Sequence, residues 1–107
     1  MPSSSGACTV AAGVPNVAPV IRRRVLVEGR VQGVGYRASC AQRARAAGVG
    51  GLVRNLPDGG VEAVFEGPRA TVDGLVDWCR HGPAYAHVDR LQIVDEEPVG
   101  ETQFRVA

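Results

Sequence analysis

The order in which two hydrophobic periods alternate after residue 20 constrains the fold more than any other feature of this sequence. Residues 21–28 alternate between two faces, and a period of two is typical of a strand. A glycine-rich loop follows. Residues 36–47 then repeat small apolar side chains at helical spacing, and Gly48 provides a helix stop. We therefore expect a strand, a loop and a helix in that order.

The next segment has the pattern of a hairpin. A short strand through residues 52–55 is followed by the turn Pro57-Asp58-Gly59-Gly60, and residues 61–66 alternate again. Proline presets one turn position and glycine tolerates a positive φ, so this turn joins two strands readily. We expect both strands to be neighbours in an antiparallel sheet.

A second helix and two more strands complete the pattern. Pro68 is expected to open the helix, where a missing N–H costs nothing, and the helix should end at residues 81–83. A fourth strand runs through residues 88–94 and a short last one through 104–106. The order β-α-β-β-α-β predicts an α+β, ferredoxin-like sandwich, with an antiparallel sheet, two helices on one face and a short fifth strand.

Length and the first twenty residues define the domain organisation. A chain of 107 residues has the usual size of one domain. Residues 1–19 carry no charge and are rich in Pro, Ser, Gly and Ala, so we expect a disordered tail before a folded domain over 20–107. The basic residues follow the apolar part of this tail, unlike an export signal, and no apolar run could span a membrane. A cytoplasmic monomer is expected.

Charge and lysine content exclude several functions. All twelve basic residues are arginine, against eleven acidic ones, so the net charge is only +1. Without lysine the chain can form neither a Walker-type phosphate loop nor a Schiff base. A strongly basic face for nucleic acid is not expected either.

The cysteines and histidines do not indicate a metal site or a disulfide framework. Cys8, Cys40 and Cys79 form no close pair, and we expect Cys40 and Cys79 to be small buried apolar residues. His81 and His87 lack further ligands at suitable spacing. We expect no metal and no cofactor.

The run Arg22-Arg23-Arg24 and the pair Asp73 and Asp77 have simple interpretations. The three arginines could form a surface for an anionic ligand, but the alternation favours solvated side chains at the start of a strand. The two aspartates are four residues apart on the side of the second helix opposite its apolar stripe, where a paired-carboxylate site is not expected.

The glycine-rich loop between the first strand and the first helix is the strongest candidate for a binding site. Glycines let successive N–H groups converge, and the positive end of a helix dipole adds to them, so the loop could hold an anion. Arg37 is a cation at a helix start, which only a bound anion would favour. Asn55, next to the hairpin turn, could cap its own backbone or hold a water molecule.

Several motifs occur together in the order found in one known family. They are RVQGVGYR at 30–37, GLVRN at 51–55, GGV at 59–61, EG at 66–67, WCRHGP at 78–83 and FRV at 104–106. Over about residues 23–106 the chain resembles acylphosphatases of the bacterial type. The resemblance implies a ferredoxin-like fold and an enzyme that hydrolyses acyl phosphates to a carboxylate and inorganic phosphate.

The resemblance also implies roles for individual residues. The phosphate-binding arginine falls on Arg37 and the water-orienting asparagine on Asn55. The implied backbone cradle for phosphate is formed by Arg30, Val31, Gln32, Gly33, Val34, Gly35 and Tyr36. Water would attack phosphorus without a metal, and the carboxylate would leave without protonation. The protein would then need only to stabilise the charge of the phosphoryl group and to position the reactants.

Two other functions remain open at this stage. A regulatory domain could bind phosphorylated metabolites without turnover. An RNA-binding module of the RRM type has the same strand and helix order, but it stacks bases on aromatic side chains of its central strands, and here those strands offer Phe65 alone.

Overall fold

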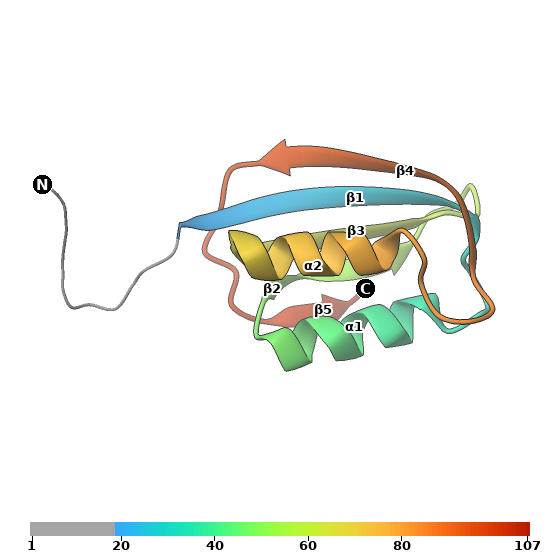
Figure 1. Ribbon diagram of the computed structural model, residues 1–107, viewed down its shortest axis with the longest axis horizontal. Helices are drawn as coiled ribbons and strands as arrows, with labels where there is room; N and C mark the ends of the chain where they lie inside the picture. Colours follow the sequence, from blue (N-terminus) through green and yellow to red (C-terminus); the bar gives the residue numbers. More distant parts are fainter. Residues whose placement is uncertain (1–18) are drawn as a thin grey trace, which may run out of the picture.

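The computed structural model describes residues 19–107 and contains the predicted elements in the predicted order (Figure 1). The predicted tail over 1–19, together with Cys8, lies outside the described residues except for Pro19. The elements are β1 Val20–Arg30, α1 Tyr36–Ala47, β2 Gly50–Asn55, β3 Val61–Pro68, α2 Arg69–Cys79, β4 His87–Glu96 and β5 Phe104–Val106.

The sheet has the strand order β4-β1-β3-β2-β5. The first four strands pair antiparallel, as predicted, but β5 pairs parallel with β2. The direction of β5 follows from its path: the chain leaves β4 at one edge of the sheet, crosses at the end opposite the hairpin loop, and returns along the other edge in the direction of β2 (Figure 1). The sheet is therefore mixed rather than wholly antiparallel.

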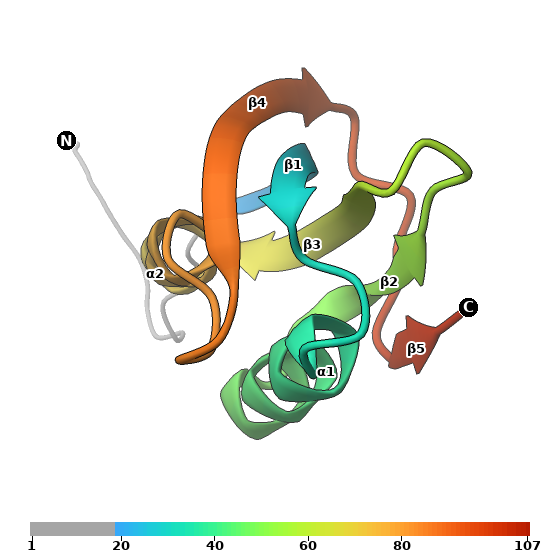
Figure 2. The same cartoon turned by 90° about the vertical axis from the view of Figure 1, so that its right-hand side faces the viewer.

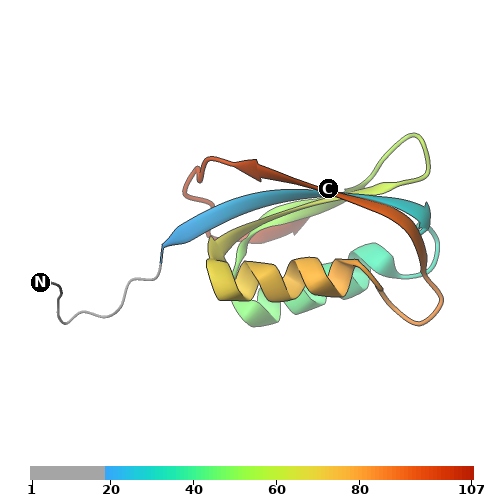
Figure 3. The ribbon, with the colours of Figure 1, turned by 45° about the horizontal axis from the view of Figure 1, so that its top comes forward.

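Both helices lie on one face of the sheet, as predicted (Figure 3). The core between the helices and the sheet is built mainly from valine, and its largest fully buried side chains are Tyr36 and Phe65. Cys40 and Cys79 are buried and free, which confirms their predicted role as small apolar residues. Within residues 19–107, neither helix is long and apolar enough to cross a membrane.

The bounds of α2 differ slightly from the prediction. Pro68 is the residue before the first helical turn and ends β3, so the helix begins at Arg69. The helix ends at Cys79, and the backbone continues as a turn through Arg80 and His81. Proline suits this junction because its fixed φ of −58° is compatible with both the strand and the helix start.

The second face of the sheet carries an ion-pair network instead of solvated arginines. Arg22 contacts Glu66 at 3.0 Å, and Arg24 contacts Glu62 and Glu96 at 2.6 Å each. The register places Arg22 directly opposite Glu66 on β3 and Glu96 on β4, which explains the pairing. The prediction of solvated arginine side chains at 22–24 is therefore wrong for Arg22 and Arg24.

Arg23 points to the helix side of the sheet, where it pairs with Asp73 of α2 and Asp95 of β4. Asp73 thus links α2 to β1 and is not simply a solvent-facing residue. Asp77 is largely exposed and contacts Arg80 at 3.4 Å. Asp73 and Asp77 thus pair with different arginines, and they form no paired-carboxylate site.

Glu66 holds the segment that crosses from β4 to β5. Only 3% of the residue is exposed, and its carboxylate accepts hydrogen bonds from the backbone N–H groups of Val99, Gly100 and Glu101 at 2.7–3.0 Å. Burial alone would raise the pKa of Glu66, but these N–H donors and Arg22 outweigh burial and lower it. The central strand therefore fixes the route of the chain into β5.

Candidate active site

The predicted site residues gather at one end of the sheet. Arg30, the loop 31–35, Asn55 and the hairpin loop 56–60 all lie where β1 and β2 end and β3 and β4 begin (Figure 2). The start of α1 is at the same end. Two segments that are separate in the sequence, 30–37 and 55–60, thus meet at this end.

The loop 31–35 is the middle part of the predicted cradle. Gly33 and Gly35 adopt left-handed φ values of 76° and 81°, which turn the backbone sharply into α1. Among the described residues, no backbone N–H from 31 to 38 donates a hydrogen bond to a protein group, and the first helical bond is donated by Ser39. These N–H groups are available to a ligand.

The start of α1 has no other feature that would satisfy these donors. It has no side-chain cap, and its first turn contains no acidic residue. The residue that precedes the helix is a glycine, Gly35, instead of the usual Ser, Thr, Asp or Asn. The helix N-terminus therefore keeps its full positive character at the cradle.

Arg37 lies in the first turn of α1 and is partly exposed. Its Nη1 donates a hydrogen bond of 3.3 Å to the backbone oxygen of Ala107. Ala107 is placed there by β5, since its N–H donates to the carbonyl of Val53 on β2 at 2.9 Å. This contact was not predicted, because the parallel pairing of β5 was not.

Asn55 is the last residue of β2 and is exposed. Its amide makes no hydrogen bond to another protein group in the part of the chain that the structure describes. The capping of the neighbouring turn is performed by Asp58 instead, whose carboxylate accepts from the N–H of Gly60 at 2.9 Å. The alternative in which Asn55 caps its own turn is therefore not observed.

Gln32 joins the cradle to the hairpin loop. Its Nε2 donates to the carbonyls of Leu56 and Gly60, both at 2.8 Å. The side chain thus holds the loop 31–35 beside the end of β2, where Asn55 lies. The prediction assigned only a backbone role to Gln32, although it is the only polar side chain between Val31 and Gly35.

Tyr36 anchors the other end of the cradle. Its hydroxyl donates a 2.7 Å hydrogen bond to the carbonyl of Cys79, and burial raises the pKa of this hydroxyl, which keeps it protonated. The ring packs against Gly82, where a Cβ atom would come within 2.6 Å of it. Tyr36 is therefore the first residue of α1 and a core residue, not part of the exposed loop.

Arg30 is also outside the loop itself. It is the last residue of β1 and lies opposite His87 of β4. The predicted cradle over 30–36 thus consists of a strand end, the loop 31–35 and a helix start.

The histidines are exposed, as predicted for side chains at a helix end and a strand start. His87 contacts Asp89 at 3.0 Å. In residues 19–107, no three or more His, Cys, Asp or Glu side chains are grouped as metal ligands would be.

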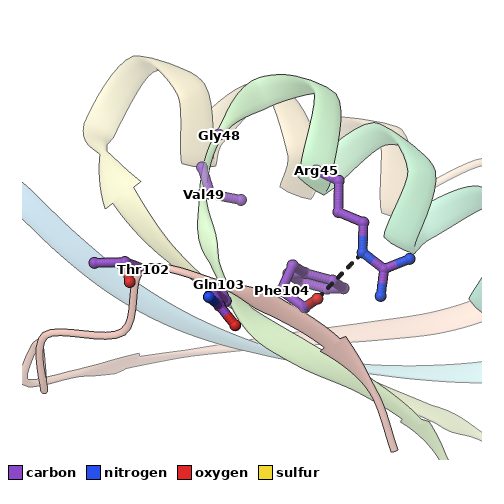
Figure 4. A pocket seen from close by; sticks show the side chains of 6 residues that line it. All are labelled: Arg45, Gly48, Val49, Thr102, Gln103 and Phe104. Atoms are coloured by element: carbon purple, nitrogen blue, oxygen red, sulfur yellow. Dashed lines mark hydrogen bonds between the residues drawn. The ribbon is translucent and has the colours of Figure 1, made fainter.

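A separate cavity of about 390 Å³ lies at the opposite end of α1 (Figure 4). Arg45 crosses it and donates to the carbonyl of Phe104 at 3.2 Å. None of the predicted site residues lines this cavity. Its lining residues are Arg45, Gly48, Val49, Thr102, Gln103 and Phe104.

Comparisons with known proteins agree on one family. The family model described as Acylphosphatase matches residues 23–106. A curated acylphosphatase of Gloeobacter violaceus is 53% identical over 90 residues, which cover 84% of this chain and 97% of that protein. The structure of an acylphosphatase from Coxiella burnetii has a TM-score of 0.78 at 33% identity, covering 82% of this chain and 93% of that one. The crystal structure of the Bacillus subtilis acylphosphatase has a TM-score of 0.77 at 30% identity, covering 81% of this chain and 98% of that one.

The fold and the cradle define a small α+β domain with unbonded backbone N–H groups at one end of its sheet. The chain belongs to the acylphosphatase family. The resemblance seen in the sequence motifs, and the ferredoxin-like fold that it implied, are thereby confirmed.

Proposed function

We propose that this protein hydrolyses acyl phosphates by direct attack of water on phosphorus, with Arg37 and the cradle binding the phosphoryl group and Asn55 orienting the water. Membership of the family makes the protein an acyl phosphate hydrolase. One observation carries the assignment of residues: the N–H groups of residues 31–38, which donate to no protein group in the described part of the chain, adjoin Arg37 at an uncapped helix start.

The phosphoryl oxygens would be bound by two kinds of donor. The N–H groups of the cradle supply fixed dipoles, and the planar guanidinium of Arg37 offers a fork that matches two oxygens. The bond from Arg37 to Ala107 engages only one of its five N–H donors, so others remain for the ligand. The oxygen of Ala107 supports the proposal because it orients the guanidinium before substrate binds.

The amide of Asn55 would hold the attacking water through its oxygen while its NH₂ group faces a phosphoryl oxygen. Gln32 supports this geometry because it fixes the hairpin loop against the cradle. An amide is not a strong base, so we propose that a substrate oxygen takes the proton from water. The protein then contributes mainly charge stabilisation and alignment.

The leaving carboxylate is stable at neutral pH and needs no general acid. The negative charge that spreads over the phosphoryl oxygens in the transition state is met by the guanidinium and the backbone dipoles. We propose that the reaction proceeds in this way without a metal or a cofactor.

Family membership does not favour the two alternatives. A non-catalytic phosphometabolite domain would use the same cradle but would not turn over acyl phosphates. An RRM-like module would need exposed aromatic rings on the central strands, whereas Phe65 is 0% exposed and stacks on Phe104 at 5.7 Å between ring centroids. Neither nucleic acid nor a membrane is proposed as a partner.

We further propose that residues 20–107 carry the activity and that the protein acts as a cytoplasmic monomer. Gel filtration combined with light scattering would test the oligomeric state, and cell fractionation would test the location.

Hydrolysis of benzoyl phosphate in the presence of EDTA tests the proposal directly. We expect release of benzoate and inorganic phosphate at a rate that EDTA leaves unchanged. Binding of phosphate without turnover would support the regulatory alternative. A requirement for an added metal would contradict the mechanism.

A further inference from the structure

A β-bulge distorts the pairing of β1 and β4 directly beside the cradle. Glu28 pairs with Arg90 and Gly29 pairs with Val88, so Asp89 is an extra residue on β4. Gly29 has a φ of 133°, and a Cβ atom there would lie 2.1 Å from the carbonyl oxygen of His87. Bulges re-aim side chains and are common next to active sites.

The bulge forms one wall of a hollow on the flank of the cradle. The hollow has a volume of about 610 Å³, and Arg30, the residue directly before the loop 31–35, is part of its lining. The segment between α2 and β4 also lines it, with Tyr85 84% exposed. The full lining is Arg30, Ala84, Tyr85, Ala86, His87 and Asp89.

Arg30 is the only arginine in the lining of this hollow. In residues 19–107, Arg30 has no carboxylate within ion-pair distance. Asp89 is the only acidic residue in the lining, and its Oδ1 is 3.0 Å from Nε2 of His87. The guanidinium of Arg30 is therefore the one group in the hollow that a negatively charged ligand could pair with.

The position of the hollow fits the geometry of in-line displacement. Water and leaving group lie on opposite sides of phosphorus in phosphoryl transfer. Asn55 is on β2, whereas Arg30 and His87 are on β1 and β4, with β3 between β1 and β2. If water is held at Asn55 and phosphorus at the cradle, the acyl group leaves toward the side of Arg30.

We infer that this hollow receives the acyl part of the substrate, and that the Arg30 side chain favours acyl groups with an anionic substituent. The inference rests on the proposed function. It assigns to the side chain of Arg30 a role in substrate selection that is separate from any role of its backbone in holding phosphate.

Two substrates of equal ring size test it: benzoyl phosphate, whose acyl group is uncharged, and 4-carboxybenzoyl phosphate. The measured quantity is the ratio of their kcat/KM values, because a general loss of activity cancels from it. The ratio is taken as the value for the carboxylated substrate divided by the value for benzoyl phosphate. We expect Arg30→Gln to lower this ratio about threefold, which corresponds to the loss of one solvent-exposed ion pair. Raising the NaCl concentration to 0.5 M should lower the wild-type ratio toward that of the variant.

Arg90→Gln is the matched control, since Arg90 is an exposed arginine on β4 outside the hollow. We expect it to leave the ratio unchanged. An unchanged ratio in Arg30→Gln, or an equal fall in both variants, would overturn the inference while leaving the proposed function intact. If the wild-type protein hydrolyses neither substrate, the proposed function fails, and the inference fails with it.

Discussion

The hydroxyl of Tyr36 donates a 2.7 Å hydrogen bond to the carbonyl oxygen of Cys79, which joins the first residue of α1 to the last residue of α2. Both groups are buried, so the carbonyl would have no partner without the hydroxyl. The start of α1, on which the cradle depends, is thereby fixed to the second helix.

Tyr36→Phe is expected to lower the free energy of unfolding by about 1–2 kcal/mol, because it leaves the buried carbonyl without its donor. Urea denaturation followed by circular dichroism measures the change. Tyr85→Phe removes the same atom from an 84% exposed side chain and should leave the midpoint unchanged. Equal midpoints for Tyr36→Phe and the wild type would contradict the assigned role of the bond.

Glu66→Gln is expected to cost about 2–3 kcal/mol of stability, because a charged acceptor of three backbone N–H groups becomes neutral and gains a donor. Its ion pair with Arg22 is lost as well. Glu97→Gln is the control, since Glu97 is exposed on the same crossing segment. A loss as large in the control would mean that net charge, not the hydrogen bonds, decides the effect.

Acid should destabilise the fold through the same network. Burial would raise the pKa of Glu62, but hydrogen bonds from Arg54 and Arg24 outweigh it, and Arg24 lowers the pKa of Glu96. Carboxylates with a lowered pKa contribute stability above their unfolded pKa, about 4.3, and this contribution is lost as the pH falls through the folded value. We expect urea midpoints to be constant between pH 7 and 5 and to fall between pH 4.5 and 3. Glu96→Gln should show a smaller fall over that range, and a fall of equal size would argue against this network.

The two proposed site residues should differ in their effects. Arg37→Ala should lower kcat/KM for benzoyl phosphate by roughly 100-fold or more and also weaken inhibition by inorganic phosphate, because the guanidinium binds ground state and transition state. Asn55→Ala should lower kcat by a similar factor with little change in phosphate inhibition. Arg69→Ala, at the far end of α2 from the cradle, should change neither. Loss of phosphate inhibition in Asn55→Ala would contradict its assignment to water.

Two glycines should respond to alanine in opposite directions. Gly29 has a φ of 133°, and Gly29→Ala places a Cβ atom against the carbonyl of His87. We therefore expect the free energy of unfolding to fall by about 3 kcal/mol or more. Gly74 lies in α2, and no atom lies within 4 Å of a Cβ added there. Gly74→Ala should therefore raise the free energy of unfolding by about 0.5–1 kcal/mol. Thermal unfolding of the two variants checks both signs.

The elements could be predicted because each carries its own period and its own stop signal. The helix over residues 36–47 agrees with the structure at both ends, since Gly48 adopts the left-handed conformation of a helix end. The direction of β5 could not be predicted, because it depends on three N–H groups that bind Glu66 from 33–35 residues away. The alternation that identified β3 contains no sign of these contacts.

The placement of the candidate site residues was predictable where the backbone dictates it and not where side chains bridge segments. The cradle, Arg37 and Asn55 follow from glycine positions and family motifs, and topology alone brings them to one end of the sheet. Gln32 reaches carbonyls 24 and 28 residues away, and local sequence contains no sign of such a contact. The assignment of Arg22 and Arg24 failed for the same reason, because their partners lie on other strands.

The environment of Trp78 has an optical consequence. It is the only tryptophan in the chain, its ring lies 5.2 Å from that of Tyr36, and the guanidinium of Arg43 lies 5.2 Å above it. Its emission therefore originates from a single place, one side chain away from the start of the cradle helix. Unfolding can be followed by this intrinsic fluorescence without a label, and we expect phosphate titrations to be readable by it as well.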